Sequence, residues 1–468
     1  MSRFLFVVPP LTGHTNPTVG VGLALEARGH EVAWTGYAKA LRPLLPERAQ
    51  LIPVGDDPDD DDPALAAARQ RAQGLRGAEA LLFLWQDFLL PLGRAMVPGV
   101  DAAVSAFRPD VVVVDQQAIA GAVVARRRGL RWATSATTSA ELVDPFALLP
   151  KVGEWVAAAL AQFQSDFGDG GGGDLRFSEH LVLAFTTAAL AGPQRSFPDH
   201  YRFVGPSLAR RPAPVSFPWE WLDPSRRLVL VSLGTINAEA GRRFLREAVA
   251  ALASMADRVQ GVVVGPSDLL PSGLVPSGLV PSELVPSGLV PSELGPSELV
   301  PSELGPSDLV PSGLVPAGPE NVLIRGFVPQ LEVLTRASAV VSHGGHNTVC
   351  ESLAHGLPLV VAPIRDDQPI VAQQVVDAGA AVRVKFGRVR APELAGAMAS
   401  VLDQPGYREA AGRLRASFEA SGGSVAAAAA LESLASGAGA GEGAGGADPY
   451  DSRSPGPTAA ALGSPFAI

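Results

Sequence analysis

Two polar segments of this chain combine residue types that could bind an anion and move a proton. The first is Ser342-His-Gly-Gly-His-Asn-Thr-Val-Cys-Glu351, which predicts a strand, a glycine turn and the start of a helix. Gly344 and Gly345 let a ligand approach the backbone closely, and the helix N-terminus offers free N–H groups at the positive end of its dipole. The segment therefore predicts a phosphate or diphosphate site.

Three side chains of this segment share one face of the predicted helix, because Asn347 and Glu351 are four residues apart and Thr348 and Glu351 are three apart. A phosphate at the helix start and a ribose diol bound by Glu351 one turn later would use that face fully. The alternative is an ordinary helix capped by Asn347 or Thr348, with Glu351 at the surface.

The second segment, Pro9–Pro17, follows the first predicted strand and contains His14. Asp115 ends another strand of the same predicted sheet, so we expect the two side chains to lie close together. A hydroxyl group that attacks an electrophilic carbon needs a general base to take its proton, and histidine suits that task near pH 7. A carboxylate behind the histidine fixes its tautomer and stabilises the imidazolium. The alternatives are a structural or helix-capping histidine and a turn or N-cap aspartate.

Other polar residues also follow predicted strands directly. They are Thr235, Gln330, His343, Asp367 and Gln368. Ligands of open α/β sheets bind beyond the carboxyl ends of the strands. Two such sheets facing each other would enclose a cleft lined by all of these residues.

The elements that position these residues alternate between strands and helices, which predicts doubly wound α/β domains. Asn16-Pro17 predicts a helix start, with Asn16 as N-cap and Gly29 just past the helix end. We expect five parts. Residues 1–208 form an N-terminal Rossmann-like domain, 209–225 a Pro-rich linker and 226–405 a C-terminal Rossmann-like domain. Residues 406–436 form helices that cross back to the first domain, and 437–468 form an unstructured tail.

Residues 266–315 repeat the unit Pro-Ser-(Gly/Glu/Asp)-Leu-(Val/Gly/Leu) ten times inside the second predicted domain. A small β-solenoid could stack the leucines, but proline in every unit removes a backbone donor from each turn. The units also carry little apolar mass to offset the entropy of ordering. We expect a mobile loop insertion, partly in polyproline II conformation.

The acidic run 56–62 is more typical of a solvated loop than of a metal site.

Composition limits the class of protein. The chain of 468 residues has a net charge of −10, which argues against a general nucleic-acid binder. Cys350 is the single cysteine, so no intrachain disulfide forms and a cytoplasmic location is expected. We expect no membrane span, because no uninterrupted apolar run reaches about 18 residues. The oligomeric state is left open.

The segment His343–Glu351, preceded by Phe327-Val-Pro-Gln330 and followed by Asp367-Gln368, resembles the donor signature of family 1 nucleotide-sugar glycosyltransferases. The N-terminal Pro9-Pro-Leu-Thr-Gly-His14-Thr-Asn-Pro17 resembles the acceptor-domain opening of the same family, especially its actinobacterial macrolide-type branch. The resemblance covers about residues 1–265 and 316–430. It implies the GT-B fold, with the acceptor on the first domain and the nucleotide sugar on the second.

The resemblance also implies a role for each matching residue. Phe327, a tryptophan in many relatives, stacks on the nucleobase, while the Val328 backbone and Gln330 bind its edge. The diphosphate contacts Thr235, His343, Asn347 and Thr348 beside Gly344 and Gly345, the ribose contacts Glu351, and the sugar hydroxyls contact Asp367 and Gln368.

These residues predict an inverting, metal-independent O-glycosyltransferase that needs no cofactor besides its nucleotide-sugar substrate, either UDP-glucose or a dTDP-deoxysugar. His14 acts as the base, supported by Asp115. The acceptor would be a small apolar hydroxylated natural product; the apolar stretches 81–90 and 142–167 either line its pocket or form plain core. The alternatives are a nucleotide-sugar epimerase on the same fold and a non-catalytic partner of another transferase.

Overall fold

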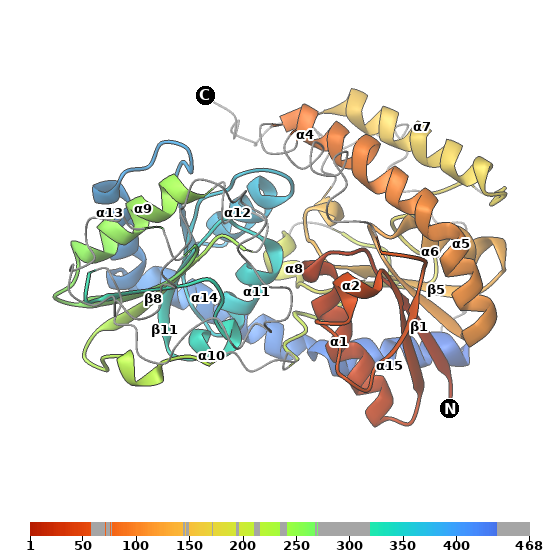
Figure 1. Ribbon diagram of the computed structural model, residues 1–468, viewed down its shortest axis with the longest axis horizontal. Helices are drawn as coiled ribbons and strands as arrows, with labels where there is room; N and C mark the ends of the chain where they lie inside the picture. The colour runs from red at the N-terminus through yellow and green to blue at the C-terminus, as the bar shows by residue number, and fades with distance from the viewer. Residues whose placement is uncertain are drawn as a thin grey trace, which may run out of the picture.

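The computed structural model describes residues 1–57, 71, 75, 77–143, 146, 149–170, 172–192, 196–209, 216–234, 241–266, 269 and 319–437. They form two α/β domains side by side, each with a parallel sheet between helices (Figure 1). The predicted pair of Rossmann-like doubly wound domains is confirmed. Apart from Pro266 and Leu269, the repeat lies outside the described residues, so the loop insertion stays a prediction, as does the unstructured tail beyond Gly437.

The sheet of the first domain has seven strands in its described part, in the order β3-β2-β1-β4-β5-β6-β7, and every pairing is parallel. The central strands β1, β4 and β5 are almost wholly buried on both faces, as the Val, Phe and Leu content of β1 and β4 predicts. The strands are β1 Arg3–Val7, β2 Glu31–Gly36, β3 Gln50–Pro53, β4 Val111–Asp115, β5 Arg131–Ala136, β6 Val182–Ala184 and β7 Tyr201–Phe203.

Two helical layers cover this sheet. Helix α1 packs on one face, while the long helix formed by α4, a π-helical turn η1 and α5 packs on the other with α6 and α7. The helices and helical turns are α1 Thr12–Ala27, α2 Ala38–Leu41, α4 Gly77–Phe83, η1 Leu84–Leu89, α5 Leu90–Phe107, α6 Ile119–Arg127, η2 Glu141–Val143, α7 Pro150–Asp166 and α8 Ala188–Ala191.

The second domain repeats this plan with six described strands in the order β10-β9-β8-β11-β12-β13, again all parallel. They are β8 Arg227–Ser232, β9 Val259–Val264, β10 Val322–Arg325, β11 Ala337–Ser342, β12 Leu359–Val361 and β13 Ala381–Arg383. The helical elements are η3 Trp219–Trp221, α9 Arg242–Ala253, α10 Gln330–Leu334, α11 His346–Ala354, α12 Gln368–Asp377 and α13 Ala391–Asp403.

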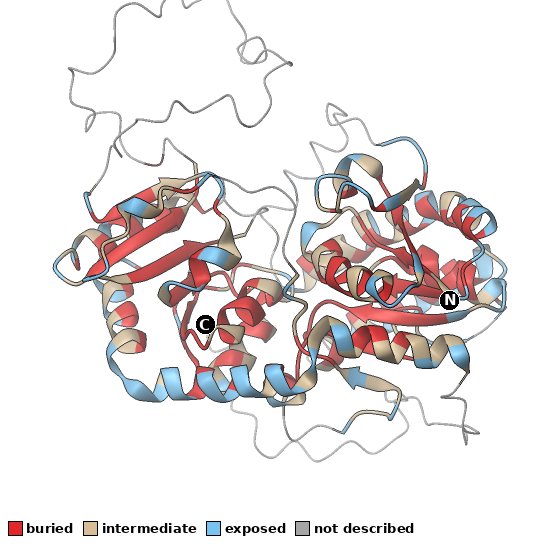
Figure 2. Ribbon diagram, turned by 90° about the horizontal axis from the view of Figure 1, so that it is seen from below, coloured by how far each residue is buried: buried red, intermediate tan, exposed pale blue. Residues whose placement is uncertain are grey.

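The last two helices connect the domains. Helix α14, Pro405–Ser421, packs on α11 in the second domain, and α15, Gly423–Ser436, runs beneath the first domain against α1 (Figures 1 and 2). Ala427 and Leu431 of α15 are fully buried there, and Glu432 pairs with Arg28 at 2.8 Å. The chain therefore ends its described part on the domain in which it began.

The start of α1 differs from the prediction. The helix begins at Thr12, after Leu11, so Pro17 lies in its second turn and Asn16 is not the cap. Proline is favoured at the first helical position, but it is tolerated here because the N–H that it lacks would serve the carbonyl of Gly13, which has another donor. His14 therefore stands in the first helical turn, not in a loop.

Gly20 and Gly22 of α1 have a packing role. A Cβ on Gly20 would lie 2.5 Å from Oγ of Ser424 in α15, and a Cβ on Gly22 would lie 2.3 Å from the ring of Trp34 in β2. The two glycines let a helix and an indole ring approach α1 closely. This explains a Gly-x-Gly pair inside a helix, away from the strand-to-helix turn of a dinucleotide site.

Residues Gly77–Phe107 form one helix that is long and apolar enough to cross a membrane by length and composition. Its later residues, including Met96, Val100 and Phe107, are buried in the core against the sheet. A core helix passes the same test, so this helix is weak evidence for a span.

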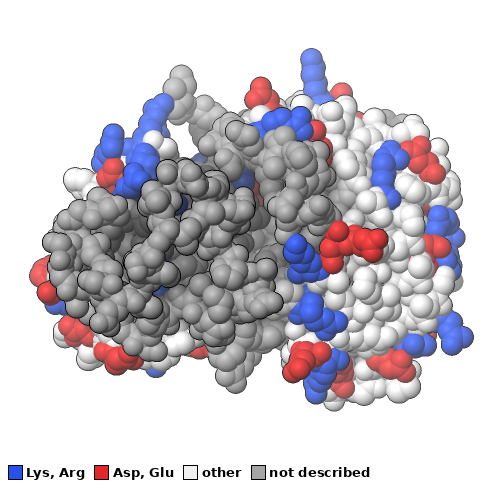
Figure 3. Space-filling model, viewed as in Figure 1, with Lys and Arg blue, Asp and Glu red and all other residues white. Residues whose placement is uncertain are grey.

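On the face seen in Figure 3, basic and acidic side chains are interspersed.

We predict that Gly22→Ala lowers the free energy of unfolding by about 1–3 kcal/mol, because Trp34 cannot move aside. Trp34 is fully buried, and its Nε1 donates to Oγ1 of Thr18 at 2.9 Å. Thermal unfolding followed by circular dichroism measures the effect. Gly412→Ala on α14 is the control, because an added Cβ there meets nothing within 4 Å. Equal melting temperatures for the two variants would contradict the close contact.

Candidate active site

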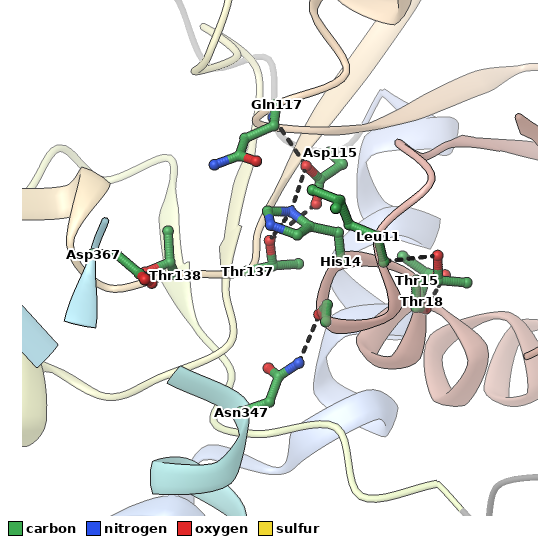
Figure 4. A network of polar contacts seen from close by, with 11 residues as sticks. Leu11, His14, Thr15, Thr18, Asp115, Gln117, Thr137, Thr138, Asn347 and Asp367 are labelled. Atoms are coloured by element: carbon green, nitrogen blue, oxygen red, sulfur yellow. Dashed lines mark hydrogen bonds and ion pairs between the residues drawn. The ribbon is translucent and has the colours of Figure 1, made fainter. Parts of the chain in front are cut away.

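The first domain brings His14 and Asp115 together at the carboxyl ends of two adjacent strands. His14 follows β1 and Asp115 ends β4, and β1 pairs with β4 through Val7 and Val114. Nδ1 of His14 lies 2.9 Å from Oδ1 of Asp115, which is fully buried (Figure 4). The two residues are 101 positions apart in the sequence, so the parallel pairing of the strands creates the dyad.

Two further donors hold the Asp115 carboxylate. The Gln117 N–H donates to Oδ1 at 2.9 Å, and the Thr137 hydroxyl donates to Oδ2 at 3.0 Å (Figure 4). Oγ1 of Thr137 also lies 2.8 Å from Nδ1 of His14. Sequence reasoning missed Thr137, although it follows β5 directly and so obeys the rule that singled out Asp115.

The environment of His14 makes it a stronger base. Burial favours the neutral ring, but the charge of the Asp115 carboxylate and its hydrogen bond outweigh burial and raise the pKa of His14 above its ordinary value. The charges of Asp367 and Glu141 act in the same direction. Because Nδ1–H faces a carboxylate, Nε2 is the atom of the neutral ring that can accept a proton.

In the second domain, two glycines shape the turn before α11. Gly344 has φ +85°, and a Cβ there would lie 3.2 Å from the Gln368 carbonyl oxygen. A Cβ on Gly345 would lie 2.4 Å from Nε2 of His343. The packing of this turn therefore requires both glycines, and the first N–H groups of α11 have no partner within the helix, as at any helix N-terminus.

His343 is buried behind this turn. Burial lowers its pKa to about 4, so the ring is neutral at physiological pH. Among the described residues, its buried Nδ1 has no hydrogen-bond partner. A buried polar atom without a partner is costly, so a ligand that supplies one would be stabilised at this position.

The residues predicted to hold the nucleoside lie together beyond β10. Nε2 of Gln330 donates to Oε2 of Glu351 at 2.6 Å, which links the start of α10 to α11. The Phe327 side chain is 60% exposed, whereas Val328 is buried. An exposed aromatic ring beside a paired amide and carboxylate could stack on a base and bind the polar edge of a nucleoside.

Asp367 and Gln368 begin α12 after Asp366, a residue with φ +56°. Oε1 of Gln368 accepts from the Ile364 and Arg365 N–H groups at 2.9 and 3.1 Å, so this atom shapes the loop. Oδ2 of Asp367 accepts from the Thr138 hydroxyl of the first domain at 2.6 Å (Figure 4). The Asp367 carboxylate thus already binds a hydroxyl across the cleft.

One small cavity lies between the two domains, beside the site. It has a volume of about 10 Å³ and lies among residues of α1, α11 and the segments that follow β6 and β7: Asn16, Pro17, Phe185, Pro206, Ser207, Asn347, Cys350 and Glu351. Of the predicted donor residues, Asn347 and Glu351 line it, and Thr348 is buried beside them. Thr235 lies outside the described residues. A cavity of this size is too small to hold a nucleotide.

The apolar stretches of the first domain lie mainly in the core. Trp85, Phe163 and most other buried residues of 81–90 and 150–166 belong to the core. A buried ion pair, which sequence reasoning missed, lies nearby: Arg176 donates to Glu141 at 2.8 Å.

Among the described residues, no group of three or more His, Cys, Asp or Glu side chains is placed to hold a metal ion.

Comparison with known proteins agrees with this geometry. Residues 312–434 match the family described as erythromycin biosynthesis protein CIII-like, C-terminal domain. The chain is 28% identical to 4'-demethylrebeccamycin synthase of Lentzea aerocolonigenes, over 92% of this chain and 99% of that protein. It is 27% identical to demethyllactenocin mycarosyltransferase of Streptomyces fradiae, over 93% and 87%.

Over most of its length, the chain is similar to natural-product glycosyltransferases. Solved structures with the same fold include glycosyltransferase SnogD from Streptomyces nogalater, with a TM-score of 0.62 and 22% identity over 93% of this chain and 99% of that one. Another is VinC in complex with DTDP, with a TM-score of 0.63 and 18% identity over 93% and 99%. The predicted family resemblance and GT-B fold of this homologue are thereby confirmed, and these relatives favour sugar transfer from a nucleotide sugar over epimerisation.

We predict that Asp115→Asn moves the acidic limb of the kcat/KM profile to lower pH. The base must be neutral, so activity falls as the pH drops through the pKa of His14, and loss of the carboxylate lowers that pKa. The maximal rate should fall by roughly 10³-fold or more, as in other His–Asp pairs. A pH series of initial rates measures both effects.

Asp110→Asn, at the opposite end of the same strand, is the matched control, because Asp110 accepts only a backbone hydrogen bond from Arg3 in the described residues. It should leave the profile unchanged. An Asp115→Asn enzyme with the profile of the unmodified chain would show that Asp115 does not act on the base.

Proposed function

We propose that this glycosyltransferase homologue transfers a sugar from UDP or dTDP to a hydroxyl of a small natural product, with inversion at the anomeric carbon. The observation that carries the proposal is the His14–Asp115 contact of 2.9 Å, which lies on one wall of the cleft while the turn before α11 lies on the other. A base and an anion site on opposite walls fit a reaction in which a proton leaves one substrate and a diphosphate leaves the other.

In the proposed reaction, Nε2 of His14 removes the proton of the acceptor hydroxyl as the oxygen attacks the anomeric carbon. The bond from that carbon to the diphosphate oxygen breaks, and the nucleoside diphosphate leaves with the bonding electrons. Asp115 stabilises the imidazolium that forms. The N–H groups at the start of α11 stabilise the charge that develops on the diphosphate.

The donor half of the proposal rests on the exposed Phe327, the Gln330–Glu351 hydrogen bond and the buried, neutral His343 behind the turn. The bound DTDP named for VinC supports a nucleoside diphosphate in the same fold. The relatives named for rebeccamycin and lactenocin chemistry support a natural-product acceptor. Assays should therefore begin with both UDP-glucose and dTDP-sugars and a panel of hydroxylated polyketides and aromatic aglycones.

We expect His14→Ala to abolish transfer while the affinity for UDP or dTDP stays close to that of the unmodified chain, because the donor residues lie on the other domain. Product formation by mass spectrometry and calorimetric titration of the nucleotide measure the two effects. His180→Ala, at a more exposed histidine of the same domain, is the control. Near-normal transfer by His14→Ala would refute His14 as the base.

The stereochemistry is a further readout of the same proposal. Direct attack by the activated hydroxyl inverts the anomeric centre, so an α-linked gluco-configured donor should give a β-linked product. The coupling constant of the anomeric proton reports the configuration by NMR. A product with retained configuration would overturn the single-displacement mechanism and leave the fold unaffected.

We also propose that transfer needs no metal ion, since the developing charge is met by a helix N-terminus and backbone N–H groups. Turnover should be unchanged after treatment with EDTA and gel filtration, measured as nucleoside diphosphate released per minute. Loss of turnover in EDTA that Mg²⁺ restores would contradict this.

A further inference from the structure

His346, the second histidine of the segment His343–Glu351, has no part in the proposed reaction. It is the first residue of α11 and is 5% exposed. Its ring contacts two segments of the first domain. Nδ1 lies 3.4 Å from the Ser139 nitrogen, beyond β5, and Nε2 lies 3.3 Å from the Phe185 carbonyl oxygen, beyond β6.

These two partners determine the protonation of the ring. A carbonyl oxygen only accepts, so Nε2 carries the proton and donates to Phe185. A backbone N–H only donates, so Nδ1 accepts from Ser139. The neutral imidazole satisfies both contacts at once, and burial keeps the pKa of His346 below its ordinary value.

Three other hydrogen bonds join the same walls of the cleft. Thr138 donates to Asp367 at 2.6 Å, and Ser139 donates to Oε1 of Gln374 at 2.5 Å. Nδ2 of Asn347 donates to the Gly13 carbonyl at 2.6 Å (Figure 4). Three consecutive side chains of the first domain therefore make these contacts. Thr137 contacts His14, the proposed base, and Thr138 contacts Asp367 just before α12. Ser139 contacts Gln374 in α12 and His346 in α11.

The contact with Gly13 depends on Pro17. In a regular helix the Gly13 carbonyl accepts from the N–H of the residue four positions later, and proline has none. That carbonyl is therefore available to Asn347, directly beside the base. The first two residues of α11, 346 and 347, therefore contact the first domain at three places: Ser139, Phe185 and Gly13.

We propose that His346 is a positioning residue that pins the anion-site helix α11 to the first domain and so holds the cleft of the glycosyltransferase closed. It acts through the relative placement of the two domains and does not touch the substrates. The inference builds on the proposed function, because closure places the diphosphate site opposite His14. Closure also excludes water, which would otherwise compete with the acceptor for the sugar.

The test uses the full chain with His346→Phe and His346→Gln. Phenylalanine fills the same space but makes neither hydrogen bond, whereas the glutamine amide retains a donor for the Phe185 carbonyl. Loss of one such hydrogen bond changes the ratio of closed to open molecules by about tenfold. His355→Gln, at the C-terminal end of the same helix, is the matched control.

Small-angle X-ray scattering of the nucleotide-free chain measures closure independently of any activity. We expect a larger radius of gyration for His346→Phe than for the unmodified chain, an intermediate value for His346→Gln, and no change for His355→Gln. An unchanged radius in a His346→Phe variant that keeps its circular dichroism spectrum would overturn the proposal. If His346→Phe does not fold, the same comparison with His346→Gln decides.

Two enzymatic readouts separate positioning from donor binding. With UDP-glucose and dTDP-glucose, His346→Phe should release a larger share of free sugar relative to transferred sugar, while its affinity for UDP and dTDP stays near that of the unmodified chain. A drop in nucleotide affinity as large as the drop in kcat would make His346 a donor-binding residue and refute the pin. Absence of turnover by the unmodified chain would instead count against the proposed function, and the scattering result would still decide on the pin.

Discussion

The rest of the site depends on the need to satisfy one buried charge, the carboxylate of Asp115. A fully buried carboxylate is tolerated only with partners, and removing one of them is strongly destabilising. Its partners come from three places: His14 in α1, Gln117 in its own turn, and Thr137 after β5. The same bonds that make the charge tolerable therefore fix the orientation of His14, the proposed base.

The second domain faces the opposite task. In the proposed reaction, charge develops on a leaving diphosphate and would be met by the N–H groups at the start of α11, after the turn at Gly344 and Gly345. The neutral His343 behind it has an uncommitted Nδ1 among the described residues. Each domain thus contributes one electrostatic element, and neither is complete for chemistry alone.

Much of this arrangement follows from local sequence. The strands β1, β4, β8 and β11 are rich in apolar residues, and polar residues at or beyond the end of such strands mark the edge of a parallel sheet, so sequence reasoning could single out His14, Asp115 and His343 as candidates. The glycines before α11 also carry a local signal. These features depend on residues adjacent in the chain, which is why sequence reasoning reaches them.

What sequence reasoning missed depends on distant partners. Thr137, Thr138 and Ser139 look like ordinary hydroxyl residues of a turn, and their roles come from contacts with His14, Asp367 and Gln374, up to 235 residues away. The start of α1 was wrongly placed for the same reason: the donor that compensates for Pro17 is Asn347 in the other domain. Local preference could not reveal a carbonyl that is satisfied by another domain.

The two chain segments that join the domains pass each other at one point. The Gly423 N–H, between α14 and α15, donates to the Val204 carbonyl at 2.7 Å, and Ser207 and Ser424 are hydrogen-bonded at 2.9 Å. Two covalent crossings at one place act as a single pivot, so rotation about it displaces each residue in proportion to its distance from the crossing. The cavity lined by Pro206 and Ser207 adjoins this pivot. Rotation about this pivot would therefore separate the walls of this cavity least and would widen the cleft most at the points farthest from the crossing.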